Sequence, residues 1–302
     1  IIKKISLIVC CVMMLGCLTA PGVFAYEQRY DDESPEDTHS ANQSSDSAGT
    51  QNASPGNNAS DDQTVTSTSD NVVVPSDQTS VISQPDASQL VSGETIVITI
   101  DAGHGGKDSG AVGKLGRKKY CEKDLNLAIA VAIRDELLTY QNVEVHMTRA
   151  TDKYLSLSKR VAIAKKYDSD LLYSVHIDWA RSKKVSGAHA LISAGQYRKS
   201  LAKVTKAIGA YSLANLNVNF GIKNGGYLKR YSSRLRYPNK KRADYYAIVR
   251  QGTLVGIPSM IMEHGYISNK ADLRRMDTDD ELKAIGISDA TAIAQYYGLV
   301  KK

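Results

Sequence analysis

The stretch IVITIDAGHGGKDSGAVG, residues 96–113, is the part of the sequence that indicates the fold most clearly. An apolar run beginning at Ile96 passes directly into a glycine-rich turn that carries His104. Such a run is typical of a buried strand, and the glycines let the backbone turn sharply and a ligand approach closely. A phosphate-binding P-loop is excluded, because Lys107 is followed by Asp108 and Asp101 stands where the motif needs its first glycine.

Strand-like and helix-like segments alternate after this stretch. Further strands are expected at residues 143–147, 170–175, 187–192 and 259–262, and helices at residues 123–140, 155–167, 196–214 and 280–297. The alternation predicts a single α/β catalytic domain whose mostly parallel central sheet is flanked by helices on both faces.

Polar side chains stand where several of these elements begin or end. His104 and His176 follow apolar strands, Glu122 precedes a helix, and Glu263 ends the apolar run 260–262. In open α/β sheets, sites lie beyond the carboxyl ends of the strands. Two histidines and one glutamate meeting there could hold a zinc ion and leave a position open for water. Glu263, which is costly to bury unpaired, could then move protons, and the set suggests a metallohydrolase.

Each of these residues has a plainer interpretation when it is taken alone. His176 could be a hydrogen-bonded core histidine, and a glutamate such as Glu122 is common near a helix start. His264 could be a rival ligand or could assist Glu263.

The other histidines and the cysteines carry weaker signals. His146 and His189 lie within expected strands, and we interpret them as structural. Three of the four cysteines fall in the first 17 residues, so Cys121 is the only one in the expected mature chain and no disulfide within it is possible. Beside Glu122, Cys121 could be a ligand or a nucleophile, but such a cysteine is more often a small, semi-buried side chain.

Charge is unevenly distributed along the 302 residues. The formal net charge is +6, but residues 26–94 hold 13 acidic residues and one basic residue, which leaves residues 95–302 with 35 basic and 19 acidic residues. A domain with this net charge of +16 is attracted to polyanions such as nucleic acid, anionic lipid or an acidic cell wall. Residues 229–242 carry seven basic side chains and no acidic one, and they could bind nucleic acid, flank a sugar-binding groove or form a solvated loop.

The first 92 residues predict an exported protein. Residues 1–25 read as a signal peptide, with two lysines before a short apolar stretch and a small-residue cleavage site after it. Residues 26–92 are acidic and rich in Ser, Thr and Asp, which predicts a disordered linker, and residues 93–302 form the catalytic domain. The expected location is secreted, in the cell wall or outside the cell; anchoring to the membrane by an uncleaved N-terminal segment is the alternative.

Several motifs, taken in order, resemble one known family. They are IDAGHGGKDSGAVG from Ile100, EKDLNLAIA from Glu122, MTRATD from Met147, LLYSVHID from Leu171, and YAIVRQGTLVGIPSMIMEHGYISN from Tyr246. Residues 96–299 are similar to the zinc-dependent N-acetylmuramoyl-L-alanine amidases of the bacterial cell wall, the amidase 3 catalytic domain. The resemblance implies a phosphorylase/hydrolase-like sheet, one Zn²⁺ per chain bound by His104, Glu122 and His176, and Glu263 as the catalytic carboxylate.

The resemblance also implies a substrate. The enzyme would cleave the amide bond between the muramic acid lactyl group and L-alanine of peptidoglycan, as an autolysin in wall remodelling, cell separation or sporulation. Peptidoglycan would be the partner, with anionic wall polymers drawn to the basic surface; no nucleic acid and no stable membrane span of the mature form are expected.

The chain departs from the family pattern at several positions. Ile177 and Asp178 replace Ala-Asn, His264 replaces Thr, and residues 227–241 resemble an insertion. Two alternatives therefore stay open: another zinc peptidase of the wall, such as a carboxypeptidase that shortens stem peptides, and a catalytically inactive protein that binds the wall or polyanions.

Overall fold

The computed structural model describes residues 72–74 and 94–302. The helices are α2 (Glu122–Leu137), α3 (Leu157–Lys166), α4 (Lys199–Phe220), α5 (Ala247–Val255), α6 (Lys270–Leu273) and α7 (Asp279–Tyr297). The strands are β1 (Val72–Val74), β2 (Ile96–Ala102), β3 (Val112–Leu115), β4 (Lys118–Cys121), β5 (Val143–Met147), β6 (Leu171–Asp178), β7 (Ala188–Leu191), β8 (Asn224–Lys229), β9 (Tyr231–Arg236), β10 (Arg242–Asp244) and β11 (Ser259–Tyr266).

A seven-stranded mixed sheet forms the centre of the domain, in the order β1-β8-β7-β11-β6-β2-β5. Four neighbouring strands, β11, β6, β2 and β5, run parallel to one another. Strand β7 is antiparallel to β11, β8 is parallel to β7, and β1 is antiparallel to β8. The predicted α/β domain with a mostly parallel sheet is confirmed at its centre, with two changes of direction toward the β1 edge.

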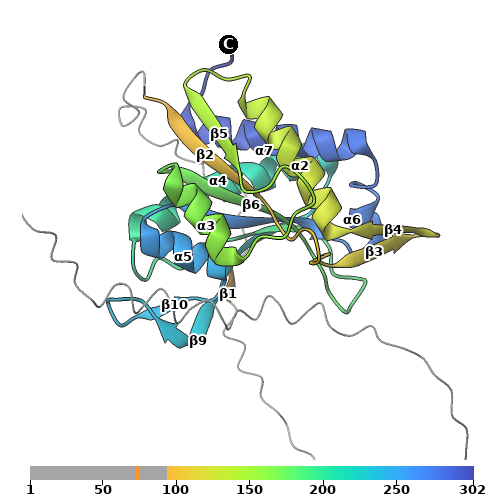
Figure 1. Ribbon diagram of the computed structural model, residues 1–302. Coiled ribbons are helices and arrows are strands. Elements are labelled where there is room, and N and C mark those ends of the chain that lie inside the picture. The colour runs from red at the N-terminus through yellow and green to blue at the C-terminus, as the bar shows by residue number, and fades with distance from the viewer. Residues whose placement is uncertain (1–71, 75–93) are drawn as a thin grey trace, which may run out of the picture. The chain divides into compact units, whose positions relative to one another are not determined.

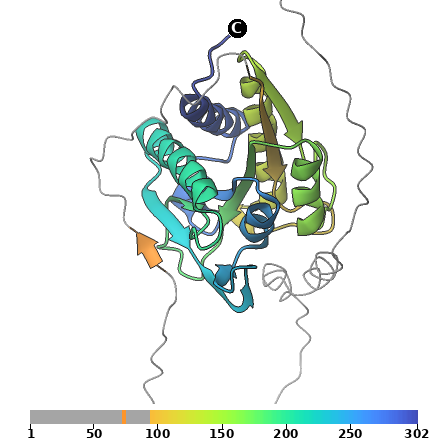
Figure 2. The same ribbon diagram turned by 90° about the vertical axis from the view of Figure 1, so that its left-hand side faces the viewer.

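Helices cover both faces of this sheet (Figures 1 and 2). Helices α2, α4 and α7 pack on one face over the larger hydrophobic core, and α3 and α5 pack on the other over a smaller one. Because successive side chains of a strand point to opposite faces, alternate residues of one strand enter different cores. In β6, Tyr173 and Val175 enter the larger core and Leu172 the smaller one; in β11, Met262 enters the larger core and Ile261 the smaller one.

Each strand and helix that the sequence predicts is present, whereas β8, α5 and α6 were not predicted. Strand β5 has the predicted bounds, whereas α4 begins three residues later than predicted and continues six residues further, to Phe220. The β3–β4 hairpin was not predicted; it turns at Gly116, which has a φ of 57° and thus adopts the left-handed region that favours glycine. Much of the basic segment 229–242 is strand and not loop, because β9 and β10 pair antiparallel, while several of its basic side chains are exposed to solvent.

The leader falls almost wholly outside the described residues. The signal peptide at residues 1–25 lies outside them, and so does the linker at 26–92 except for residues 72–74, so both stay predictions. Those three residues form β1 against β8, with Val73 opposite Leu228. Among residues 72–74 and 94–302, no helix is both long and apolar enough to span a bilayer.

A chain that begins at Thr95 and lacks β1 is expected to fold. Both hydrophobic cores are built from residues 96–299, and β1 contributes only three residue pairs at the edge of the sheet. We expect its Tm to lie within about 4 °C of that of the longer chain, a difference of about 1 kcal/mol for a domain of this size. Thermal unfolding followed by circular dichroism checks this, and loss of a cooperative transition would show that the leader belongs to the folding unit.

Candidate metal centre

A buried ion pair organises the loop that follows β2. Asp101 is fully buried, and its carboxylate lies 2.7 Å from Nη1 of Arg160 and accepts a 2.6 Å hydrogen bond from the Ser174 hydroxyl. Burial would raise the pKa of Asp101, but the Arg160 charge and these hydrogen bonds lower it below its usual value. Asp101 is therefore ionised, and β2, β6 and α3 are tied together just beneath the loop.

Two arginines hold the backbone of this loop. Arg160 donates to the carbonyl oxygens of Ala102 and His104, each at 2.7 Å, and Arg149 donates to those of Ala102 and Gly103, each at 2.8 Å. His104 has a φ of 58°, a left-handed conformation that is uncommon for a residue with a side chain. The two guanidinium groups stabilise this conformation, which aims the His104 ring at the end of the sheet.

Three side chains converge there from three separate elements. His104 follows β2, Glu122 begins α2, and His176 lies in β6. Oε1 of Glu122 is 3.2 Å from Nε2 of His104 and 3.0 Å from Nδ1 of His176. One ligand atom from each residue lies within 4.8 Å of the other two, so the group could hold a metal ion.

Neighbouring groups fix the orientation of these donors. Nδ1 of His104 is 2.7 Å from Oδ2 of Asp108, which leaves Nε2 toward Glu122. Oε2 of Glu122 accepts from the backbone N–H of Ala111 at 2.8 Å, and Oε1 accepts from Nδ2 of Asn126 at 3.2 Å. Such outer partners set the tautomer and angle of metal ligands.

Glycines make room for the group. A Cβ on Gly103 would overlap the His176 ring, and a Cβ on Gly110 would stand 2.6 Å from Oε2 of Glu122 and 2.7 Å from Cδ2 of His104. Alanine at either position would displace a donor atom. The glycine-rich character of the motif is therefore explained by the packing of its backbone against the three side chains.

The electrostatics of the group fit a cation. Burial would lower the pKa of His104, but the charges of Glu122 and Asp108 and their hydrogen bonds raise it to about 10. Burial would raise the pKa of Glu122, but His104 and His176 lower it well below its usual value. A proton bound at His104 balances the buried carboxylate of Glu122, and a metal ion would take its place on binding.

Glu263 lies beside this group. In the parallel ladder of β11 and β6, Glu263 is the register partner of His176, and its side chain is 9% exposed. It shares a face with Ile261, the face covered by α3 and α5. Burial raises the pKa of Tyr246 and of Tyr266 well above the usual value, and the negative charge of Glu263 adds to both shifts. Glu263 is therefore a buried carboxylate on the strand next to His176 and on the same face of the sheet.

His264 points the other way, into the interior. Its Nε2 is 2.6 Å from Oδ2 of Asp289 in α7, and its Nδ1 is 3.0 Å from the carbonyl oxygen of His176. It is fully buried and does not join the three donors, so it is neither a rival ligand nor a helper of Glu263. Strand alternation explains this placement, because adjacent residues of β11 face opposite sides of the sheet.

Cys121, the possible ligand beside Glu122, is a half-buried free thiol that precedes α2 and stays outside the group of three. The surroundings of the group also include residues that the sequence did not point to. His189, predicted to be structural, is the register partner of Glu263 in β7, and its Nε2 lies 3.3 Å from Oδ2 of Asp178. No sequence pattern indicates that His189 lies opposite Glu263, because this placement depends on β7 being the neighbour of β11 in the sheet. The arginines Arg149 and Arg160 had no sequence signal beyond the former's place in the MTRATD motif.

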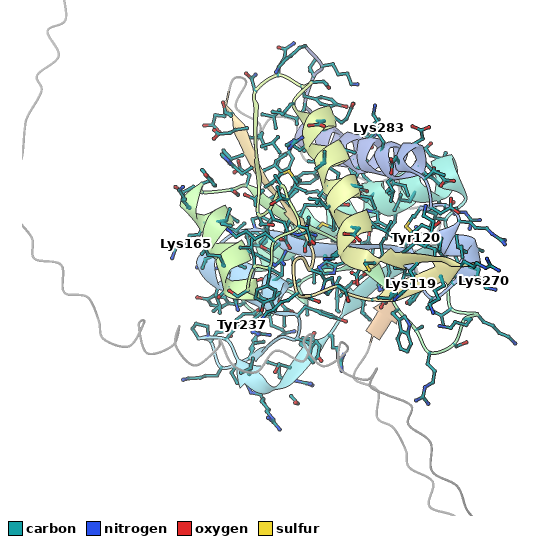
Figure 3. The ribbon with its side chains drawn as sticks, turned by 45° about the vertical axis from the view of Figure 1, so that its right-hand side comes forward. Lys119, Tyr120, Lys165, Tyr237, Lys270 and Lys283 are labelled. Atoms are coloured by element: carbon teal, nitrogen blue, oxygen red, sulfur yellow. The ribbon has the colours of Figure 1, made fainter. Side chains whose placement is uncertain are left out.

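The basic segment 229–242 forms an ordered, aromatic-rich hairpin. The guanidinium of Arg230 lies 3.8 Å from the ring centroid of Tyr245, and that of Arg242 lies 5.2 Å from the ring centroid of Tyr231. Tyr237, labelled in Figure 3, donates a 2.7 Å hydrogen bond to Oδ2 of Asp244 and stacks on Tyr197. These contacts hold the basic side chains on a folded surface.

Replacing Asp289 with asparagine should destabilise the domain. Burial would lower the pKa of His264, but the Asp289 charge and the hydrogen bonds to Asp289 and the His176 carbonyl raise it. Because the pKa of His264 is higher in the folded state, its protonation stabilises the fold. This stabilisation is complete below the unfolded-state pKa of 6.5 and is lost as the pH rises through the folded-state pKa. Asp289→Asn should therefore cost about 3 kcal/mol at pH 6 and less at pH 9, measured by chemical denaturation in chelator.

The matched control for this variant is Asp280→Asn in the same helix. Asp280 is exposed in the first turn of α7, so this change should cost under about 1 kcal/mol at either pH. A loss for Asp289→Asn that is equal at the two pH values would contradict the assigned charge of His264.

Comparison with known proteins places this chain in one family. The family model described as N-acetylmuramoyl-L-alanine amidase matches residues 98–295. A relative in Escherichia coli O6:H1, N-acetylmuramoyl-L-alanine amidase AmiC, is 29% identical over 67% of this chain, which spans 53% of that protein's length. A putative amidase of Buchnera aphidicola from Acyrthosiphon pisum is 28% identical over 67% of this chain and 94% of its own length.

Solved structures agree with these sequence matches. The catalytic domain of CwlV, an N-acetylmuramoyl-L-alanine amidase from Bacillus (Paenibacillus) polymyxa var. colistinus, superposes with a TM-score of 0.54 at 28% identity, covering 67% of this chain and 98% of that one. Cwp6 from Clostridium difficile gives 0.57 at 28% identity, covering 70% of this chain and 30% of that one. The motif at the end of β2 and the fold that carries it thus identify the chain as a member of the N-acetylmuramoyl-L-alanine amidase family, Amidase_3.

Proposed function

We propose that this chain is a secreted, zinc-dependent amidase that cleaves the bond between the muramic acid lactyl group and L-alanine in peptidoglycan. One observation carries the proposal: His104, Glu122 and His176 converge at the strand ends, and Glu263 is the register partner of His176 on the neighbouring strand. This arrangement supplies a metal site and a separate carboxylate beside it. Membership of the amidase family supports the bond that is cut.

The donor set fits zinc. Two imidazole nitrogens and one carboxylate are a usual set for a catalytic zinc, in which three protein ligands leave a position open. Asp108, Ala111 and Asn126 hydrogen-bond to His104 and Glu122 and fix their orientation. Metal ligands in proteins are commonly fixed by hydrogen bonds of this kind. Zinc bound there would supply Lewis-acid polarisation of the scissile carbonyl and an acidified water.

Glu263 is proposed as the general base. Its carboxylate lies outside the three-donor group, on the same face of the sheet as His176. It accepts a proton from the attacking water as the oxygen bonds to the carbonyl carbon.

The basic surface fits a wall substrate. Residues 95–302 carry a net charge of +16, and Arg230, just before β9, and Arg242, in β10, lie against tyrosine rings. Anionic wall polymers would be attracted to this face. With the signal peptide predicted at residues 1–25, the enzyme would act outside the cell in wall remodelling, cell separation or sporulation.

A peptidoglycan digest tests the proposed function. Incubating the full chain with purified peptidoglycan and zinc should release intact stem peptides with a free L-alanine amine, identified by mass spectrometry, and a chelator should abolish the release. Free D-alanine or shortened peptides would instead indicate a carboxypeptidase. Binding to the wall with no cleavage after zinc loading would contradict the enzyme and favour a wall-binding protein.

Glu263→Gln should separate catalysis from metal binding. Glutamine keeps the size of the side chain but cannot accept the proton, so we expect kcat to fall by about 10²-fold to 10⁴-fold with zinc content unchanged. Atomic absorption on the purified variant gives the zinc content. Loss of zinc together with activity would show that Glu263 is a ligand, and Glu144→Gln on the far strand β5 serves as the control, with activity and zinc unchanged.

A further inference from the structure

Four side chains stand in a row across neighbouring strands at the site. In the order of the sheet, His104 follows β2, His176 lies in β6, Glu263 in β11 and His189 in β7. Glu263 is the register partner of both His176 and His189. Directly opposed residues have Cβ atoms about 5 Å apart on the same face of the sheet, so His189 extends the row beyond Glu263.

His189 faces the side of the sheet on which the site lies. Its neighbours Ala188 and Ala190 point into the larger core, and Leu191 points into the smaller core on the α5 side. His189 therefore shares the α5 side with Glu263. It is buried, with 8% of its surface exposed, and lies beside the more exposed Asp178.

Contacts on two elements fix the His189 ring. Nε2 lies 3.3 Å from Oδ2 of Asp178 at the end of β6, so the pair crosses over β11. Oδ1 of Asp178 accepts from the backbone N–H of Trp179 at 2.6 Å. Tyr266 stacks against the imidazole with centroids 5.6 Å apart. The groups that face His189 are thus Asp178, Glu263 and Tyr266.

We propose that His189, held by Asp178, is a second catalytic residue that protonates the leaving amine of the substrate. This inference rests on the proposed amidase function and deepens it. The geometry separates two tasks along the row: Glu263, next to His176, takes the proton of the attacking water, and His189, one strand further along, supplies a proton to the departing nitrogen.

Protons and electrons are conserved when the carbon–nitrogen bond is cleaved in this way. As the carbon–nitrogen bond breaks, its electron pair passes to the nitrogen, which takes a proton from the imidazolium of His189. The neutral imidazole stays hydrogen-bonded to Asp178 and regains a proton from Glu263 or from solvent. Water thus gives its oxygen to the carboxylate product, and the amine leaves protonated. A general acid is needed because an alkylamine is too basic to depart as an anion.

A purely structural role is the competing explanation. The Asp178–His189 pair could serve only to pin β6 and β7 together across β11. The two roles differ in how they depend on the leaving group. A structural role would reduce turnover of every substrate, whereas a general acid matters only for leaving groups that need a proton.

The test compares two leaving groups in the zinc-loaded full chain and its His189→Gln variant. The substrates are N-acetylmuramoyl-L-alanyl-D-isoglutamine and the p-nitroanilide of N-acetylmuramic acid, whose weakly basic aniline leaves with little help. We expect the variant to lose kcat about 100-fold or more on the alanine amide and less than about fivefold on the anilide, at unchanged zinc content and Tm. Asp178→Asn should show the same pattern with a smaller loss.

His146→Gln is the matched control. His146 is also a strand histidine paired with a carboxylate, at 2.7 Å from Glu144, but it lies in β5 at the far edge of the sheet, and its substitution should leave both substrates unaffected. Equal losses on the two substrates, no loss, or a loss that follows zinc content would overturn the role of His189. Absence of turnover of both substrates by the wild-type chain would overturn the proposed function itself.

Discussion

The buried pair of Asp101 and Arg160 is the interaction on which the site depends. It joins β2 to α3 beneath the loop, and the same guanidinium binds the carbonyl oxygens of Ala102 and His104. Without it, a buried carboxylate would lose its partner and His104 would lose the constraint that keeps its backbone left-handed. An ion pair that is costly to bury thus orients the side chain of a proposed metal ligand, a role that an apolar pair of the same size could not perform.

The alternation of side chains along β11 then places neighbouring polar residues on opposite faces of the sheet. Glu263 and His264 are adjacent in the chain, yet Glu263 shares a face with its neighbour His176 and His264 is buried against Asp289 on the opposite face. The buried pair supports the site from beneath, because His264 also binds the carbonyl oxygen of His176. One face thus carries the side chains that would act on substrate, and the other carries those that fix the backbone.

Much of this could be predicted from the sequence, for physical reasons that differ between regions. The central strands and the long helices show clear hydrophobic periodicity, and the glycine-rich turn after β2 pointed to His104. The β3–β4 and β9–β10 strands were missed because they are short and rich in charge, so no apolar pattern marks them. His189 was missed because its meaning depends on the order of strands in the sheet: only the pairing of β7 with β11 brings it to Glu263.

The most direct test of the account is X-ray absorption spectroscopy at the zinc edge of the zinc-loaded full chain, with its His176→Ala variant beside it. The account predicts one zinc per chain with two imidazole nitrogens and otherwise oxygen ligands, no sulfur, and loss of this site in the variant. A sulfur ligand from Cys121, or a zinc site that the variant retains unchanged, would contradict the assignment of His104, Glu122 and His176 as the metal centre.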